Sequence, residues 1–317
     1  MFSLEEMPIS ANEDGHDKEM ISIIIPSLNE GQFLQQTIEA IYATTRAEFE
    51  IIIVDDASSD GSTEHIDWGN YPGLLFHRNS ERLGLIRSRI LGSTFARGSY
   101  LVFMDAHCNP EPGWELALLE ASHKYQDRTI TAPVIPMLDA TTWRNYPHQV
   151  GQTMTFDQNL DMAWCATLGL NFDNGCWQSP VFAGNCFLVS RIFYEELGGL
   201  DNGLTFWGAE NIDLSLRCWM FGGKVLVVKS SVVGHMFKSG FNYALTQEDI
   251  TGNKLRVVYV NFSDERYQRV SQHLGVVNKP AKEVVPYWLS ADRRRAYLMD
   301  NRHFDDNWYM EKFGIVV

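Results

Sequence analysis

The sequence has few cationic side chains and no long apolar run. Lys and Arg number 26 against 40 Asp and Glu, which gives a formal net charge of −14. Stable binding to nucleic acid is not expected from this balance, because such binding depends mainly on cationic contacts to phosphates. A membrane-spanning helix needs about 20 consecutive apolar residues, and no stretch approaches that length. We therefore expect neither a nucleic-acid-binding protein nor a membrane-spanning segment.

Cysteines are scarce as well. The five cysteines are an odd number with no closely spaced pair, so neither a disulfide framework nor a zinc knuckle is indicated. Reduced, buried thiols and a cytoplasmic location are the expectation. Residues 1–19 are acidic and lack the apolar core of a signal peptide, and they are predicted to form a mobile tail.

Apolar residues are plentiful by contrast, at 45% of 317 residues with nine Trp, which is enough for a substantial core. In the first half, apolar β-branched runs alternate with helical patterns. This alternation is typical of an α/β fold with a mostly parallel, Rossmann-like central sheet flanked by helices. The predicted strands are 21–26, 51–54, 74–76 and 101–105, and the predicted helices are about 33–41 and 82–96.

The second half of the chain is less regular. Residues 131–180 contain many prolines and aromatics without periodicity, and they are predicted to be a loop-rich substrate face. A strand is predicted at 181–190, a helix at 209–221 and a further strand at 225–233. The segment from about 244 onward is polar and predicted to be helical in part.

The strand at 101–105 ends in Asp105, and His107 follows two residues later. Side chains alternate with period two on an extended backbone, so Asp105 and His107 are expected on the same side. Open α/β sheets bind ligands at the carboxyl edge of their strands, and a carboxylate and an imidazole there can share a divalent cation. His235 also follows a buried strand and is the candidate third ligand, although a lone His is more often structural.

Two further groups of polar residues suit a nucleotide. Asp56 follows the strand at 51–54 and can accept a hydrogen bond from a base or a ribose hydroxyl. A loop-capping Asp is the alternative. Arg82 and Arg89 are seven residues apart and are expected on one stripe of a helix, where two guanidiniums beside a metal suit a diphosphate. A solvated basic face is the alternative for this pair.

The predicted helix at 209–221 carries a possible sugar site. Glu210, Asp213 and Arg217 are spaced to share one face, which is expected opposite a buried apolar face. Acids behind Trp207 and Gly208 could bind sugar hydroxyls while the indole stacks on the ring. The alternative is that Glu210 and Asp213 only interact favourably with the helix dipole, and that the Asp213–Arg217 pair contributes little to stability.

Together these stretches resemble the catalytic domain of the polypeptide N-acetylgalactosaminyltransferases, which are GT-A glycosyltransferases. The similar stretches are 54–56, 82–89, 103–108, 179–184, 207–219 and 233–237, in the family's order. The resemblance implies a GT-A catalytic domain at residues 20–243, with a partly helical extension at 244–317 packed on it.

The resemblance implies a metal-dependent enzyme that moves a hexose or N-acetylhexosamine from a UDP-sugar to an acceptor, with retention of the anomeric configuration. Manganese, or magnesium in its place, would be held by Asp105, His107 and His235. The implied nucleotide-sugar site consists of Pro26, Glu30, Asp56, Arg82, Arg89, Ala183, Gly184 and Trp207. The implied catalytic residues are Glu210, Asn211, Asp213 and Lys238, the last near the departing diphosphate.

Three positions depart from the family: Asn185 and Ala209 stand where it has glycine, and Lys238 where it has arginine. Asp213 could act as a base, which leaves open an inverting family 2-type glycosyltransferase for a glycan or other polymer. A nucleotidyltransferase and a non-catalytic sugar-nucleotide binder are further alternatives. The acceptor is open among a peptide, a glycan, a lipid-linked sugar and a modified nucleobase, and residues 238–242 are predicted to form a lid over the donor.

Overall fold

The computed structural model describes residues 19–166, 171–238, 240, 244–277 and 279–317. The tail predicted for residues 1–19 lies outside the described residues except for Glu19. The predicted lid at 238–242 lies mostly outside them as well.

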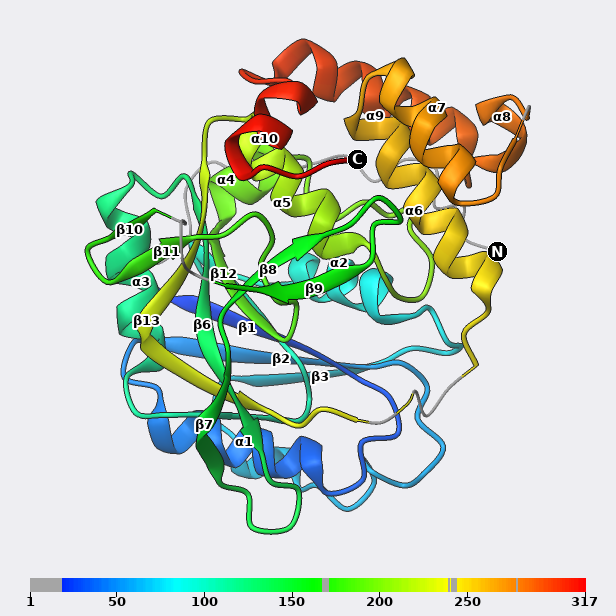
Figure 1. Cartoon of the computed structure of the whole chain (residues 1–317). Coiled ribbons are helices and arrows are strands. Elements are labelled where there is room, and N and C mark those ends of the chain that lie inside the picture. The colour runs from blue at the N-terminus through cyan, green and yellow to red at the C-terminus, as the bar shows by residue number, and fades with distance from the viewer. Residues whose placement is uncertain (1–18, 167–170, 239, 241–243, 278) are drawn as a thin grey trace.

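A large mixed sheet organises the fold (Figure 1). The strands in its middle are β1 (Ile21–Ser27), β2 (Phe49–Asp55), β3 (Leu74–Arg78), β4 (Tyr100–Met104), β6 (Thr129–Leu138), β12 (Cys186–Ser190) and β13 (Lys224–His235). They pair in the order β13-β6-β12-β4-β1-β2-β3. β12 runs antiparallel to both of its neighbours, whereas the other pairings among these strands are parallel. The predicted α/β class with a mostly parallel central sheet is confirmed.

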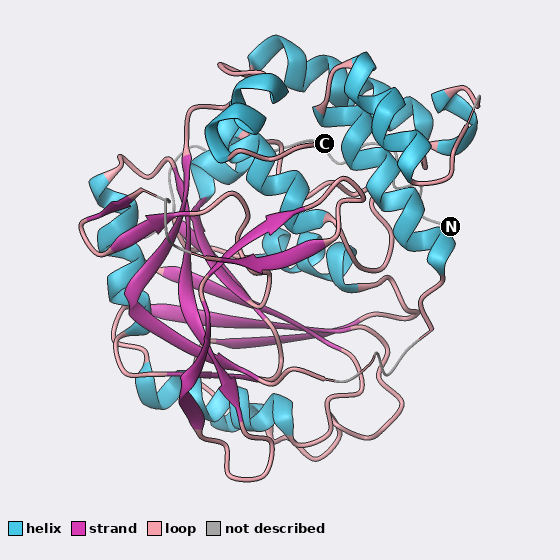
Figure 2. Cartoon of the chain, in the orientation of Figure 1, coloured by secondary structure: helices cyan, strands magenta, loops and turns pink. Residues whose placement is uncertain are grey.

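Helices cover both faces of this sheet, as Figure 2 shows. The α-helices of the described residues are α1 (Phe33–Thr44), α2 (Leu85–Phe95), α3 (Trp114–Lys124), α4 (Arg191–Glu196), α5 (Glu210–Met220), α6 (Gln247–Asn261), α7 (Asp264–His273), α8 (Ala281–Val284), α9 (Trp288–Asn301) and α10 (Asp306–Phe313). No helix among them is both long and apolar enough to cross a membrane.

The central strands are apolar on both faces, so they build two cores. Ile23 of β1 belongs to the same core as Ile38 of α1, whereas Ile24 belongs to the other core with Ile86 of α2. Successive side chains of a strand point to opposite faces, and burial of both faces explains the continuous Ile-rich runs. These runs fix the positions of the strand ends, where the polar residues of interest begin.

The helices after residue 244 join the core on the α2 and α5 side. Val257 and Tyr309 are buried there, and the Tyr309 hydroxyl donates to the carbonyl oxygen of Pro180 at 2.9 Å. Arg256 of α6 forms a buried ion pair with Asp201 at 2.8 Å. The division at residue 243/244 remains a prediction, but the two segments share one apolar core.

The prediction of a loop-rich segment at 131–180 is wrong. Besides most of β6, this region holds β7 (Asn145–Gly151), β8 (Thr153–Phe156), β9 (Met162–Cys165), β10 (Phe172–Asp173) and β11 (Cys176–Gln178), and β5 (Cys108–Pro110) precedes it. These strands are short, and their pairing is antiparallel or interrupted. Pro136 lies at an irregularity in the β6–β7 pairing, which is where a strand tolerates proline.

Two predicted boundaries also shift. The strand predicted at 181–190 begins only at Cys186, because residues 184 and 185 form a turn. The helix predicted from residue 82 begins at Leu85, after Gly84 with φ of 91°. A side chain at Gly84 would meet the Phe206 backbone, with a Cβ to Cα distance of 2.3 Å. Glycine therefore allows these two chain segments to lie against each other.

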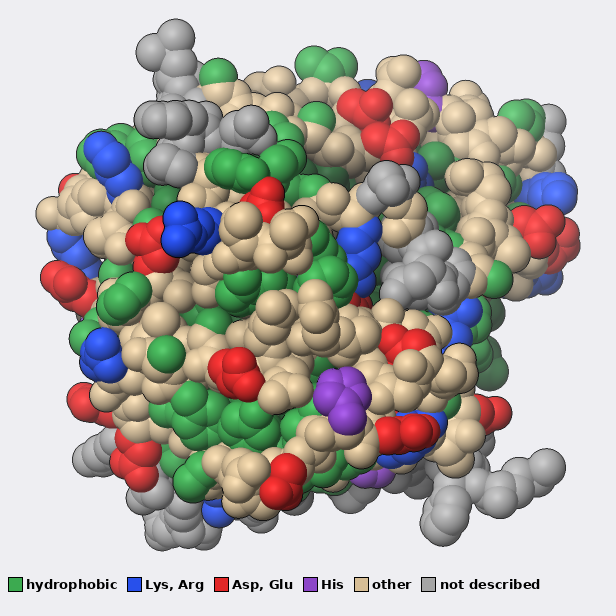
Figure 3. Space-filling view, turned by 90° about the horizontal axis from the view of Figure 1, so that it is seen from below, with side chains coloured by type: hydrophobic (Ala, Val, Ile, Leu, Met, Phe, Trp, Pro, Cys, Tyr) green, Lys and Arg blue, Asp and Glu red, His purple; other side chains and the backbone are tan. Residues whose placement is uncertain are grey.

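Charge is dispersed over the surface. The face in Figure 3 shows its acidic and basic side chains singly or in small groups among hydrophobic and polar atoms. Although the net charge of the chain is −14, the acidic side chains on this face do not form one large patch.

The predicted contrast between a polar face of α5 and an opposite, buried face does not hold, because every residue of this helix is buried. Asp213 and Arg217 form an ion pair at 2.5 Å with both side chains fully buried. Asn261 of α6 donates to the second oxygen of Asp213 at 2.8 Å. The C-terminal helices cover the surface that the periodicity of α5 would otherwise leave to solvent.

We predict that Arg217→Ala lowers the free energy of unfolding by about 3–5 kcal/mol, because it leaves the Asp213 carboxylate buried without its cation. Arg269→Ala is the matched control. Arg269 and Glu265 also form an i,i+4 ion pair, but this pair is exposed and should contribute only roughly 0.3–0.5 kcal/mol to the free energy of unfolding. Urea unfolding of both variants measures the difference. Equal losses in the two variants would contradict the prediction.

Candidate functional site

The two distant segments predicted to bind a metal do meet. One ligand atom from each of Asp105, His107 and His235 lies within 4.8 Å of the other two. Asp105 follows β4 at the carboxyl edge of the sheet, and His235 ends β13. The pairing of His235 with Cys108 of β5 brings the end of β13 beside His107. The backbone pairing of β5 with β13 therefore assembles the group.

The donor set fits a divalent cation. Both ring nitrogens of His235 are buried without a hydrogen-bond partner among the described residues, although Nε2 lies 3.4 Å from Asp105 Oδ2. Burial lowers the pKa of His235, which favours the neutral imidazole that binds metals. Burial would raise the pKa of Asp105, but contact with His235 and the charge of Arg89 outweigh it and lower the pKa to about 2. A carboxylate with two neutral imidazoles is a common ligand set for transition-metal ions.

Arg89 is the cation beside this group, and its side chain is 1% exposed. One nitrogen, Nη2, donates to Asp105 Oδ1 at 2.8 Å and to the carbonyl oxygen of Gly184 at 2.6 Å. The other, Nη1, lies 3.5 Å from Glu210 Oε1. With Oδ1 taken, Oδ2 is the Asp105 oxygen that faces His235.

The predicted stripe of Arg82 and Arg89 on one helix is wrong. Arg82 precedes α2, donates to the Ala244 carbonyl oxygen at 2.8 Å and lies over the Phe206 ring at 4.6 Å. The two arginines therefore have separate surroundings: one is buried at the acid–histidine group and the other joins the loops at Phe206 and Ala244.

The start of α5 packs against the turn before β12. A Cβ at Gly184 would lie 2.5 Å from the Asn211 amide, so any larger residue there would displace the Asn211 side chain. With its amide oriented to donate to Glu210 Oε1 (3.2 Å) and accept from Gly184 N (3.1 Å), Asn211 links both segments. Burial raises the pKa of Glu210 although Arg89 opposes the shift. Ala183 is buried beside them.

Asp56 is buried at the end of β2 and accepts from three donors. These are the backbone nitrogens of Leu83 and Gly84, at 2.7 and 2.8 Å, and the Asn79 amide at 2.8 Å. Its carboxylate thus holds the turn that leads into α2. Asp56 thus caps a loop, as in the alternative weighed for this residue, and its contact with the base remains a prediction.

The remaining predicted residues lie around the same edge. Pro26 pairs with Val54 within β1 and β2, and the carbonyl oxygen of Trp207 accepts from Asn253 at 3.0 Å. Glu30 binds both His107 and Lys238. Lys238, predicted near the diphosphate, is thus paired with a carboxylate of this chain.

Asp213 does not suit the role of a base. Its two oxygens are taken by Arg217 and Asn261, and its side chain is fully buried. A base must receive a proton from the acceptor, and neither oxygen is open to one.

Asn185 lies in the turn before β12, beside Asp105. Its backbone oxygen accepts from Asp105 N at 2.8 Å. Its side-chain Nδ2 is buried without a partner among the residues that the structure describes. A buried, unpaired donor costs about 1–3 kcal/mol, so its place beside Asp105 is notable. The replacement of a family glycine by Asn is the signal in the sequence that points to it.

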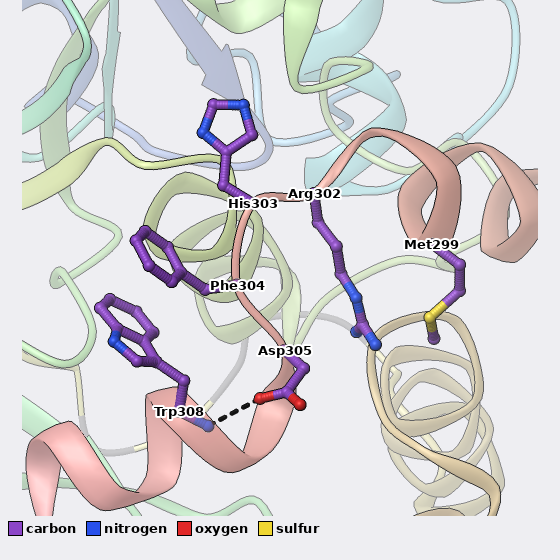
Figure 4. Close-up of a pocket in the computed structure, with 6 residues that line it drawn as sticks. All are labelled: Met299, Arg302, His303, Phe304, Asp305 and Trp308. Atoms are coloured by element: carbon purple, nitrogen blue, oxygen red, sulfur yellow. Dashed lines mark hydrogen bonds between the residues drawn. The ribbon is translucent and has the colours of Figure 1, made fainter.

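A separate hollow of about 360 Å³ lies at the carboxyl-terminal helices (Figure 4). It is lined by Met299, Arg302, His303, Phe304, Asp305 and Trp308. None of the predicted site residues lines it, and we assign it no function.

Comparison with known proteins identifies the family. The model for Glycosyl transferase family 2 matches residues 22–198, more than half of the chain. The chain belongs to this family. The resemblance to polypeptide N-acetylgalactosaminyltransferases is confirmed by relatives that are 32% identical. They are polypeptide N-acetylgalactosaminyltransferase 4 of Mus musculus, over 92% of this chain and 50% of the relative, and polypeptide N-acetylgalactosaminyltransferase 11 of Xenopus tropicalis, over 93% and 51%. The chain thus spans about half the length of these relatives.

Solved structures agree with this membership. The crystal structure of GalNAc-T7 with UDP, GalNAc and Mn2+ superposes with a TM-score of 0.78 at 25% identity, over 95% of this chain and 57% of the other. Staphylococcal TarS matches with a TM-score of 0.53 at 12% identity, over 89% of this chain and 88% of the other, and supports the fold alone. The predicted GT-A fold is confirmed.

Ala209 gives a test of the site's backbone. It precedes α5 with φ of 67°, a left-handed conformation that costs a residue with a Cβ roughly 1–2 kcal/mol. We predict that Ala209→Gly raises the free energy of unfolding by about 1 kcal/mol, because glycine adopts this conformation without that cost. Ala117→Gly in the interior of α3 is the control and should lower stability by about 1 kcal/mol. Chemical denaturation measures both, and a loss of stability in Ala209→Gly would contradict the prediction.

Proposed function

We propose that this chain is a manganese-dependent glycosyltransferase that moves a hexose or N-acetylhexosamine from a UDP-sugar to an acceptor. The observation that carries the proposal is the convergence of Asp105, His107 and His235 beside the buried Arg89 at the carboxyl edge of the sheet. The complex of GalNAc-T7 with UDP, GalNAc and Mn2+ supports this donor and this metal. Magnesium is the alternative ion.

The residues of this chain would act mainly by positioning charge. Asp105, His107 and His235 would hold the metal, and Arg89 would keep Asp105 Oδ2 turned toward His235 by binding Oδ1. The bound ion would offset the negative charge that grows on the diphosphate as UDP leaves. Glu210 and Asn211 would line the sugar, and Gly184 would let the chain approach it closely.

Retention of the anomeric configuration is part of the proposal. An inverting enzyme needs a base that takes the proton of the acceptor, and burial of Asp213 with Arg217 and Asn261 removes that candidate. Asn211 carries an amide and cannot serve as the base. NMR of the first-formed product tests the configuration, and an inverted anomer would contradict this part.

A non-catalytic role is the second candidate, because one relative carries that name. The inactive polypeptide N-acetylgalactosaminyltransferase-like protein 5 of Macaca fascicularis is 33% identical over 84% of this chain and 61% of the relative. Manganese-dependent turnover of a UDP-sugar distinguishes the two candidates. A nucleotidyltransferase is not favoured, because the loop at 26–30 lacks glycines and cationic residues.

For the acceptor we propose a peptide. The names of the relatives specify polypeptide acceptors, and exposed aromatics lie beside the metal group of this chain. Trp164 and Phe237 are 45% and 48% exposed, and the Phe237 ring lies 4.7 Å from that of His235. Such rings can pack against an extended peptide. Transfer to glycans but not to peptides would contradict this assignment.

For location we propose the cytoplasm. All five cysteines are free thiols, and four of them are buried, which suits a reducing compartment. Cell fractionation tests this part.

We predict that Asp105→Ala and His235→Ala each lower manganese-dependent UDP release by at least about 100-fold, because each removes a metal ligand and the charge stabilisation that depends on it. His273→Ala, an exposed histidine at the end of α7, is the control and should retain full activity. Steady-state UDP release with Mn2+ and a panel of UDP-sugars is the measurement. Full turnover in both ligand variants would refute the proposed site.

We predict that Asn185 influences which sugar is transferred, because its backbone oxygen binds Asp105 N and its side-chain Nδ2 is buried without a partner among the described residues. Asn185→Gly should change the ratio of kcat/KM for UDP-hexose over UDP-N-acetylhexosamine by about 10-fold or more, since it alters both the space and the hydrogen bonding of the site. Asn70→Gly, an exposed residue before β3, is the control. An unchanged ratio would show that Asn185 does not contact the donor sugar.

A further inference from the structure

Glu30 connects the two segments that carry the histidines. It lies in the loop between β1 and α1 and is 8% exposed. Its Oε2 lies 3.1 Å from His107 Nδ1. Lys238 Nζ donates to both carboxylate oxygens, at 2.8 and 2.7 Å. Lys238 follows His235 by three residues, so one carboxylate restrains both segments.

The contact to His107 defines which of its two ring nitrogens would be available to a metal ion. Glu30 is an acceptor when ionised, so Nδ1 of His107 carries the proton that it donates. Nε2 is then the unprotonated nitrogen and the one available as a ligand. A carboxylate that binds the outer nitrogen of a ligating histidine fixes its tautomer and ring orientation.

The ion pair with Lys238 makes this arrangement possible. Both Glu30 oxygens accept from the Lys238 ammonium, and Oε2 also contacts His107 Nδ1, so the buried carboxylate has a cationic partner beside it. Lys238 thus pairs with the carboxylate at the point where that carboxylate binds His107. The ion pair also fixes the position of the Lys238 ammonium group.

We propose that Glu30 is a positioning residue for the metal centre and that Lys238 acts through it, an inference that rests on the proposed function for the identity of the ion. Glu30 orients His107 directly, and it anchors the end of β13 at His235 through Lys238. The three residues come from segments at 30, 107 and 238, which are far apart in the sequence.

Binding of Mn2+ to the full chain, measured by electron paramagnetic resonance without UDP-sugar, tests this inference. Glu30→Met should weaken Mn2+ binding by about 10- to 100-fold, the range for loss of such a partner. Glu30→Gln keeps an acceptor for His107 and should lose less. Lys238→Met should also lose less, since it leaves the Glu30–His107 contact in place. Glu50→Met is the matched control. Glu50 is also buried and paired, with Arg97, but it lies at the start of β2, at the end of the strand opposite the carboxyl edge.

A charge swap separates positioning from mere stabilisation. Glu30→Lys combined with Lys238→Glu can re-form the ion pair but places an ammonium beside His107 Nδ1. We expect this double variant to remain weak in Mn2+ binding even where its thermal unfolding temperature returns toward that of the original chain. Restored Mn2+ binding in the swap, or unchanged binding in a folded Glu30→Met, would overturn the inference. Failure of sugar transfer by the unmodified chain would instead count against the proposed function, because Mn2+ binding is measured independently of it.

Discussion

The guanidinium of Arg89 is buried where three segments of the chain meet. It binds Asp105 after β4, the Gly184 carbonyl in the turn before β12, and Glu210 at the start of α5. A buried cation is costly unless it is paired and hydrogen-bonded, so these segments must keep their positions. Arg89, a residue of α2, thereby orients Asp105, the acid that faces His235. The geometry of the metal group depends on this contact.

The antiparallel strand β12 makes this meeting possible. Because β12 runs against β4, its first residues lie beside the last residues of β4. The turn at Gly184 and Asn185 is thus placed at the carboxyl edge, next to Asp105. A parallel strand would begin at the opposite edge of the sheet. One reversed strand therefore brings an additional backbone segment to the site of an otherwise parallel sheet.

The sequence predicts the first half of the fold well for a physical reason. Strands buried on both faces leave uninterrupted runs of Ile and Val, such as those of β1 and β2, and their ends locate Asp56 and Asp105. Residues 131–180 give no such signal, because β8, β9, β10 and β11 have only two to four residues each and pair as short antiparallel hairpins. The face of α5 is misjudged for a related reason, since its polar residues are covered by helices that follow in the sequence.

The candidate site is also predictable only in part. Asp105, His107 and His235 are predictable because each follows a recognisable strand and has a side chain that binds metals. The contacts that orient them are not predictable, because they join residues separated by as much as the 208 positions between Glu30 and Lys238. No local spacing in the sequence relates Glu30 to Lys238. Taken alone, each is indistinguishable from an ordinary charged side chain in a loop. The ligand types follow from local sequence, whereas their orientation follows from the tertiary pairing of β5 with β13 and the burial of Arg89 and Glu30.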